Sequence, residues 1–252
     1  MSERIPSVAI LKTDGINCDM EMAYAFEVGG AKPEQVHVNE LREGSKHLAD
    51  YQALAIPGGF SYGDDIASGA VLANELTSYL GDQLREFADD QKPILGVCNG
   101  FQVLVRTGLL PEGKLGEQKA SLTTNSSGKF ICKWVDLKPE LSVSLFGVFP
   151  GQVQKETIPM QIAHGEGRFV GSDQVVADLN KSGQIVFRYD DNPNGSMENI
   201  AGVCDPNGLI LGMMPHPERS IAAFHPDRSR TDAARNAADL IFRKIVNYAK
   251  EM

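Results

Sequence analysis

The segment Ile94–Gln102 reads Ile-Leu-Gly-Val-Cys-Asn-Gly-Phe-Gln, and it is the most informative stretch of the chain. Its apolar start predicts a buried strand, its centre a tight turn that carries Cys98, and its end the start of a helix. A side chain on such a turn projects at the carboxyl end of a parallel strand, where open α/β sheets place their active sites. Gly96 and Gly100 would let neighbouring backbone pass close to the turn. We therefore expect an α/β protein whose candidate nucleophile is Cys98.

Other patterns along the chain predict a mostly parallel central sheet with an antiparallel extension in the second half. Apolar runs predict strands at 6–11, 35–39 and 51–56, and helical spacing predicts helices at 17–28, 71–89, 99–106 and 230–249. Alternating patterns favour antiparallel strands at 129–137, 143–153, 159–163 and 183–189, and a hairpin at 200–213. No linker or repeat interrupts the chain, so we expect one domain over residues 1–252.

The composition excludes several classes of partner. The 252 residues are 42% apolar and carry a net charge of -9, without a cluster of Lys and Arg, which argues against nucleic acid and anionic membranes as partners. The start of the chain has no signal-peptide pattern and no apolar run is long enough to span a bilayer, so we expect a cytoplasmic protein. The cysteines lie singly, which suggests neither a zinc site nor disulfides. Apart from Cys98 we expect them to be structural: Cys18, Cys132 and Cys204.

A nucleophilic thiol needs a base, and His216 has the most suggestive setting of the five histidines. Pro217 disfavours helix at His216, and in an extended segment residues two apart point to the same side. His216 and Glu218 would therefore form a base with its orienting carboxylate. The backbone amides of Asn99 and of Gly59, in the glycine-rich loop after the third strand, are candidate oxyanion donors.

Each of these features also has a plainer interpretation. Cys98 could be a buried packing residue, and His-Pro-Glu alone could be a surface turn. His164 could be a metal ligand, but it lacks a second ligand at the usual spacing, so we favour a glycine-flanked binding loop there. Asp64 and Asp65 could bind a metal, although most acidic pairs in loops are simply solvated. We expect no metal in this chain.

Several motifs together resemble a known family. Residues 57–59, 96–102 and 215–218 resemble, in the right order, the three signatures of class I (triad) glutamine amidotransferases. Longer matches at 57–64, 164–169, 192–196 and 213–219 resemble the glutaminase subunits of phosphoribosylformylglycinamidine synthase, an enzyme of purine biosynthesis. The motifs span nearly the whole chain, and the fold we expect is a flavodoxin-like three-layer sandwich.

The resemblance implies a role for each matched residue. Cys98 would attack the side-chain amide of glutamine, releasing ammonia and leaving a γ-glutamyl thioester that water hydrolyses to glutamate. His216 would carry the proton, Glu218 would orient it, and the Gly59 and Asn99 amides would hold the oxyanion. The implied substrate-binding residues are Gln102, His164, Gly165, Arg168 and Phe169. Residues 64–69 depart from the family pattern, which puts the local contacts there in doubt.

The resemblance also implies partners. The glutaminase would dock on an ATP-dependent synthetase subunit, often with a small third subunit, and pass ammonia to formylglycinamide ribonucleotide to make formylglycinamidine ribonucleotide. ATP and Mg²⁺ would bind that partner, since this chain has no G-x-x-x-x-G-K-[ST] loop. Two alternatives are a free-standing cysteine hydrolase of the same architecture and a non-catalytic subunit that scaffolds a synthetase. The His216-x-Glu218 pair speaks against the first, and the complete triad against the second.

Overall fold

The computed structural model describes residues 5–146, 157–221 and 231–252. Five strands form a parallel half-sheet: β1 (Ser7–Lys12), β2 (Lys32–His37), β3 (Ala53–Ile56), β4 (Ile94–Val97) and β11 (Ile210–Met213). Four strands continue it in antiparallel fashion: β10 (Ile200–Cys204), β9 (Ile185–Tyr189), β6 (Ile131–Pro139) and β7 (Ile158–His164). The order across the sheet is β2-β1-β3-β4-β11-β10-β9-β6-β7. The predicted parallel sheet with an antiparallel extension is therefore confirmed.

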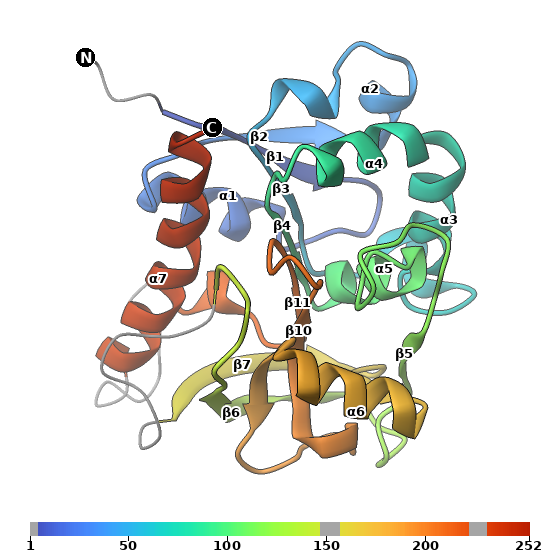
Figure 1. Cartoon of the computed structure of the whole chain (residues 1–252), viewed down its shortest axis with the longest axis vertical. Helices are drawn as coiled ribbons and strands as arrows, with labels where there is room; N and C mark the ends of the chain where they lie inside the picture. The colour runs from blue at the N-terminus through green and yellow to red at the C-terminus, as the bar shows by residue number, and fades with distance from the viewer. Residues whose placement is uncertain (1–4, 147–156, 222–230) are drawn as a thin grey trace.

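Helices cover both faces of the parallel half. Figure 1 shows α1 (Asp19–Val28) and α7 (Thr231–Lys250) on one side, and α3 (Ala70–Tyr79), α4 (Gly81–Asp89) and α5 (Asn99–Thr107) on the other. Strands β3 and β4 lie between these layers and are buried along their whole length, as continuous apolar runs in parallel sheets usually are. The arrangement is the expected three-layer sandwich. None of the described helices has the length and apolar content that a membrane span needs.

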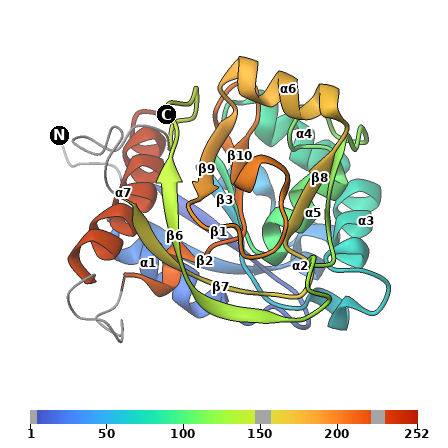
Figure 2. The ribbon, with the colours of Figure 1, turned by 90° about the horizontal axis from the view of Figure 1, so that it is seen from below.

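The antiparallel half lies below the parallel half in Figure 1. There β6 and β7 curve side by side across the molecule, as Figure 2 shows from below. A separate two-stranded sheet joins β5 (Ala120–Thr123) to β8 (Arg168–Gly171), and α6 (Asp173–Ser182) follows it. Sequence patterns missed β5, β8 and α6, because each is short and its packing depends on distant strands.

Three sequence predictions need correction or fall outside the described residues. Val38 and Asn39 begin a short helix, α2 (Val38–Arg42), instead of ending a strand, because the His37 side chain accepts a hydrogen bond from the Asn39 amide at 3.1 Å and caps it. The helix predicted at 71–89 is two helices, since the backbone leaves helical geometry at Leu80. In the run 143–153, residues 143–146 form no strand, and 147–153 lie outside the described part, as does residue 230.

The topology brings the carboxyl ends of β3, β4 and β11 to one edge of the sheet. Because β4 pairs with β3 on one side and β11 on the other, the loops after these strands are neighbours. Strand β7 reaches the same place, where His216, just after β11, donates its amide to the Gln161 carbonyl at 2.8 Å. Segments from three regions of the chain therefore meet at this edge.

Candidate active site

Cys98 occupies a strained turn between β4 and α5. Its backbone has φ 53° and ψ −104°, a positive φ that residues other than glycine rarely adopt. The Cys98 amide donates to the Met213 carbonyl at 2.8 Å, which anchors the turn to β11, and the sulfur lies 3.6 Å from the Ala163 carbonyl oxygen on β7. Such strain is common where a fold must hold a reactive side chain in one direction. The predicted strand–turn–helix placement of Cys98 is confirmed.

Two glycines make this turn possible. A Cβ on Gly100 would lie 1.9 Å from the Ile56 carbonyl oxygen, so only glycine lets α5 start against the end of β3. A Cβ on Gly96 would meet Leu104 at 2.5 Å and the Gly100 carbonyl at 2.7 Å. The close backbone approach expected from the sequence is therefore present.

His216 and Glu218 form a buried pair. The His216 Nδ1 and Glu218 Oε1 atoms are 2.6 Å apart, and the two residues are 1% and 2% exposed. The expected contact is confirmed, but the expected reason is incomplete. His216 is extended, at φ −103° and ψ 88°, whereas Pro217 opens a 3-10 turn (Pro217–Arg219) that folds Glu218 back. Turn geometry, and not strand alternation, brings the two side chains together.

The surroundings of His216 favour its charged form. Burial alone would lower the pKa of His216, but the negative charge of Glu218, the charge interaction with Cys98 and hydrogen bonding to the Cys18 and Cys98 sulfurs outweigh burial and raise the pKa well above its usual value. The Nε2 atom is buried and has no hydrogen-bond partner of good geometry among the described residues. It is therefore free to exchange a proton with a reacting group.

The two predicted oxyanion donors lie at adjacent strand ends. Gly59 follows β3 and Asn99 opens α5 directly after β4. Gly59 has φ 148°, and a Cβ there would lie 2.7 Å from the Gly15 oxygen and the Ile16 Cα, so the position requires glycine. The first amides of a helix have no acceptor within the helix, which leaves the Asn99 amide available. The oxyanion role itself stays a prediction.

A hydrogen-bond network ties Gln102 to the loops around Cys98. The Asn99 side chain donates from Nδ2 to Gln102 Oε1 at 3.0 Å and to Asp64 Oδ1 at 3.2 Å, and Gln102 Nε2 donates to the Glu166 backbone carbonyl at 2.6 Å. Asp64 is half-buried, and this burial raises the pKa of its carboxyl although Ser68 donates a hydrogen bond to it. Asp64 therefore organises residues 61–69 and is not simply solvated, whereas Asp65 is exposed.

The other four predicted substrate-binding residues have different surroundings in the structure. His164 Nδ1 lies 3.0 Å from Asn125 Oδ1, and burial lowers the pKa of His164 to about 4, so its ring is neutral. The Gly165 carbonyl accepts from the Asn125 amide at 2.9 Å. Arg168 Nε donates to the Gly195 carbonyl at 3.1 Å, and the buried Phe169 ring stacks on Phe101 at 6.3 Å. The Phe169 side chain therefore packs in the core, and the substrate contacts of all four residues stay predictions.

The cysteines predicted to be structural differ from one another. Cys204 is buried in β10, where burial raises the pKa of its thiol to about 12. Cys132 is exposed on β6, so it is not a core residue, and its structural role stays a prediction. Cys18 is 1% exposed and its sulfur lies within 4.8 Å of donor atoms of His216 and Glu218. The sequence analysis missed this position; the signal that could have revealed it is that Cys18 follows β1, a strand of the same parallel sheet.

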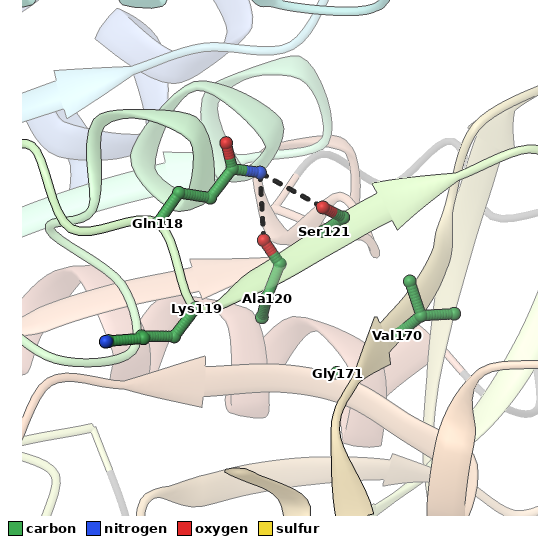
Figure 3. Close-up of a pocket in the computed structure, with 6 residues that line it drawn as sticks. All are labelled: Gln118, Lys119, Ala120, Ser121, Val170 and Gly171. Atoms are coloured by element: carbon green, nitrogen blue, oxygen red, sulfur yellow. Dashed lines mark hydrogen bonds between the residues drawn. The ribbon is translucent and has the colours of Figure 1, made fainter.

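Two further features do not change the location of the site. Cys18, His216 and Glu218 could in principle hold a cation, but Glu218 already occupies His216 Nδ1 and the Arg219 guanidinium contacts the Cys18 sulfur at 3.1 Å. An open cavity of about 390 Å³ is lined by Gln118 and Lys119 and by residues of β5 and β8. Figure 3 shows Gln118 hydrogen-bonded to the Ala120 carbonyl and the Ser121 hydroxyl there. None of the candidate catalytic residues lines the cavity.

Comparisons with known proteins agree with this geometry. The family model of the CobB/CobQ-like glutamine amidotransferase domain matches residues 5–249. A phosphoribosylformylglycinamidine synthase subunit PurQ from Methanococcus maripaludis is 42% identical over 237 residues, 88% of this chain and 85% of the relative. One from Dehalococcoides mccartyi is 41% identical over 254 residues, 96% and 97% of the two chains. A chain in the solved structure of PurLQS from Thermotoga maritima is 36% identical, with a TM-score of 0.78 and coverage of 97% of this chain and 99% of that one.

Proposed function

The chain belongs to the CobB/CobQ-like glutamine amidotransferase family and, within it, to the PurQ subunits of phosphoribosylformylglycinamidine synthase, from which we infer that it is the glutaminase of such a synthase. It hydrolyses glutamine to glutamate and delivers the ammonia to a synthetase partner. The partner uses that ammonia and ATP to convert formylglycinamide ribonucleotide to formylglycinamidine ribonucleotide in purine biosynthesis.

The first half of the reaction uses Cys98 and His216. The Cys98 thiolate attacks the carbonyl carbon of the glutamine side chain, and the carbonyl oxygen becomes an oxyanion. The amides of Gly59 and Asn99, at adjacent strand ends, would donate hydrogen bonds to that oxyanion. Protonated His216 then gives its Nε2 proton to the departing nitrogen, which leaves as ammonia when the carbon–nitrogen bond breaks. A γ-glutamyl thioester remains on Cys98.

The second half restores the enzyme. Neutral His216 takes a proton from water, the hydroxide attacks the thioester carbon, and the carbon–sulfur bond breaks to give glutamate and the Cys98 thiolate. Glu218 holds Nδ1–H of His216 throughout, at 2.6 Å, so that Nε2 faces the reacting atoms. Its charge also stabilises the imidazolium that is present at the start of the first half and is restored in the second.

Partners follow from the same family membership. We expect this chain to act in a complex with PurL-type and PurS-type subunits, since a relative of known structure is part of a PurLQS assembly. ATP and Mg²⁺ are expected to bind the synthetase partner, with no cofactor or metal in this chain. A cytoplasmic location also stays a prediction.

The buried Glu218–His216 pair beside the strained Cys98 turn carries the proposal. The test measures glutamate release by the chain alone and then with its synthetase partner, ATP and formylglycinamide ribonucleotide. We expect low activity alone and strong activation in the complex. Full activity of the isolated chain would refute the coupled reaction.

A matched variant separates glutaminase failure from failure of the complex. Cys98→Ala should abolish glutamine-dependent product formation, whereas ammonium chloride should still support synthesis because it bypasses the glutaminase. The electrophilic glutamine analogue diazo-oxo-norleucine should label Cys98 in the wild-type complex. Absence of labelling in an assembled complex would indicate a scaffold subunit instead.

A further inference from the structure

A second thiol, Cys18, lies next to the catalytic pair. It immediately precedes α1 and is 1% exposed. Arg219, the residue after Glu218, donates from Nη2 to the Cys18 sulfur at 3.1 Å, although the two are 201 positions apart in the sequence. A buried thiol with a guanidinium on its sulfur is not an ordinary packing residue, because arginine is seldom buried without a specific acceptor.

Three side chains converge on the position that a Cβ of Gly58 would occupy: those of Cys18, His216 and Cys98. A Cβ built on Gly58 would lie 2.8 Å from His216 Cε1, 3.3 Å from the Cys18 sulfur and 3.4 Å from Cys98 Cβ. The Cys18 sulfur is also within 4.8 Å of donor atoms of His216 and Glu218. His216 Nε2 is buried here without a partner of good geometry. One imidazole therefore faces two thiols.

The hydrogen bonds of Cys18 affect which of the two sulfurs accepts the Nε2 proton of His216. The Cys18 sulfur accepts from Arg219, and its S–H can donate to Asn17 Oδ1 at 3.3 Å. The Cys18 and Cys98 sulfurs both offer hydrogen bonding that favours the charged form of His216. A donor from Arg219 makes the Cys18 sulfur the poorer acceptor, so the imidazolium proton is directed to Cys98; without Arg219, the Cys18 sulfur would compete for that proton and draw the ring away from the nucleophile.

We propose that Cys18 and Arg219 form a positioning pair that holds the His216 imidazole toward Cys98. The inference rests on the proposed roles of Cys98 and His216 in glutamine hydrolysis. Neither Cys18 nor Arg219 transfers a proton to substrate, and both act through the orientation of His216. The Cys18–Arg219 contact also connects the turn after β11 to the start of α1. Glu218 contacts Nδ1 of His216, and the Cys18–Arg219 pair lies near the rest of the ring.

The charged groups around the pair act in the same direction. Arg219 faces Glu218 on its own turn, Glu21 on α1 and Cys18, the residue that caps α1. Burial alone would lower the pKa of Arg219, but Cys18 and Glu218 outweigh burial and raise it, so the guanidinium stays charged. His216 faces Glu218 and Cys98, and the neutral His164 on β7 adds no positive charge.

The test uses Cys18→Ala and Cys18→Ser in the assembled complex. Two measurements are made. Steady-state kinetics give kcat and KM for glutamine, and mass spectrometry of the Cys98 peptide gives the pH profile of iodoacetamide alkylation at Cys98. We expect Cys18→Ala to lower kcat about tenfold with KM unchanged, and to move the alkylation profile to higher pH, since a misplaced imidazolium supports the thiolate less well. Cys18→Ser keeps a donor and an acceptor and should recover most of both.

Arg219→Gln provides an independent variant. It should reproduce the loss seen in Cys18→Ala, and the double variant should be no worse than either single one, because both changes disrupt the same contact. Melting temperatures establish that each variant is folded.

An unchanged kcat and alkylation profile in Cys18→Ala and Arg219→Gln would overturn the proposal. So would a Cys18→Ser variant no better than Cys18→Ala, which would indicate packing alone. The alkylation profile does not depend on glutamine turnover. A wild-type complex that releases no glutamate would therefore refute the proposed function and still leave the positioning of His216 measurable.

Discussion

Gly58→Ala is the sharpest perturbation that the site offers. Gly58 lies in the loop after β3, outside the left-handed region of φ, so its backbone accepts alanine without strain. The new methyl group would point at the catalytic centre, 2.8 Å from His216 Cε1 and 3.4 Å from Cys98 Cβ. The substitution therefore displaces the base without changing the polarity of the site.

The size of the effect follows from these contacts. Ordinary van der Waals contact with a Cβ begins at 3.4 Å, so the His216 ring must move by about 0.6 Å. A misplacement of about 1 Å can cost roughly 100-fold in rate, so we expect kcat to fall about tenfold or somewhat more. The same crowding should lower the free energy of unfolding by about 1–2 kcal/mol.

The assay is glutamate release by the assembled complex at saturating glutamine, with KM measured in parallel. Gly81→Ala is the matched control, since its Cβ would meet only Leu115 Cδ2 at 3.4 Å, and it should keep wild-type kcat. A folded Gly58→Ala variant with wild-type kcat would refute the assigned position of His216 relative to Cys98.

Three further predictions test other parts of the structure. Glu218→Gln removes the charge that stabilises the His216 imidazolium and should lower kcat about 100-fold or more in the glutamate assay; an unchanged kcat would contradict the orienting role. His164 has a pKa of about 4 in the folded protein, below the ordinary value of about 6.5. Between these pH values the unfolded chain therefore binds more protons than the folded one. The free energy of unfolding should fall by up to about 3 kcal/mol as the pH drops from 6.5 to 4. In His164→Gln the free energy of unfolding, measured with urea at pH 5 and pH 7.5, should differ less between the two pH values. The contribution of His216 has the opposite sign, because it is lost as the pH rises through the raised pKa of His216. Since wild type and variant share that contribution, it cancels when the two are compared. Gly100→Ala, whose Cβ would overlap the Ile56 carbonyl at 1.9 Å, should destabilise the protein by about 3 kcal/mol or more, and a wild-type melting temperature would show that α5 can move away from β3.

Local sequence signals were sufficient where the structure depends on neighbouring residues. The apolar run of β4, the glycines around Cys98 and the position of the helix after it predicted the nucleophile turn correctly, because strand, turn and helix propensities act over a few residues. The His216–Glu218 contact is also local. Even there, the sequence could not distinguish an extended segment from the turn that Pro217 starts.

Other features depended on contacts between distant segments. Short elements such as α2, β5 and α6 take their conformation from caps and from packing against strands elsewhere in the chain, so weak local patterns did not identify them. The position of Phe169 in the core, against Phe101, has the same origin.

The sequence by itself predicted the candidate nucleophile, its candidate base and the class of sheet that presents them, because residue types and short spacings carry these signals. Only the tertiary structure decided that Cys18 and Arg219 share the site with His216, 201 positions apart in sequence. Strand order makes β1, β3, β4 and β11 neighbours, so the loops after their carboxyl ends meet, and the shared burial of these loops lets the charges of this cluster act on one another. No pattern within either segment encodes that meeting, since it follows from how the whole sheet is assembled.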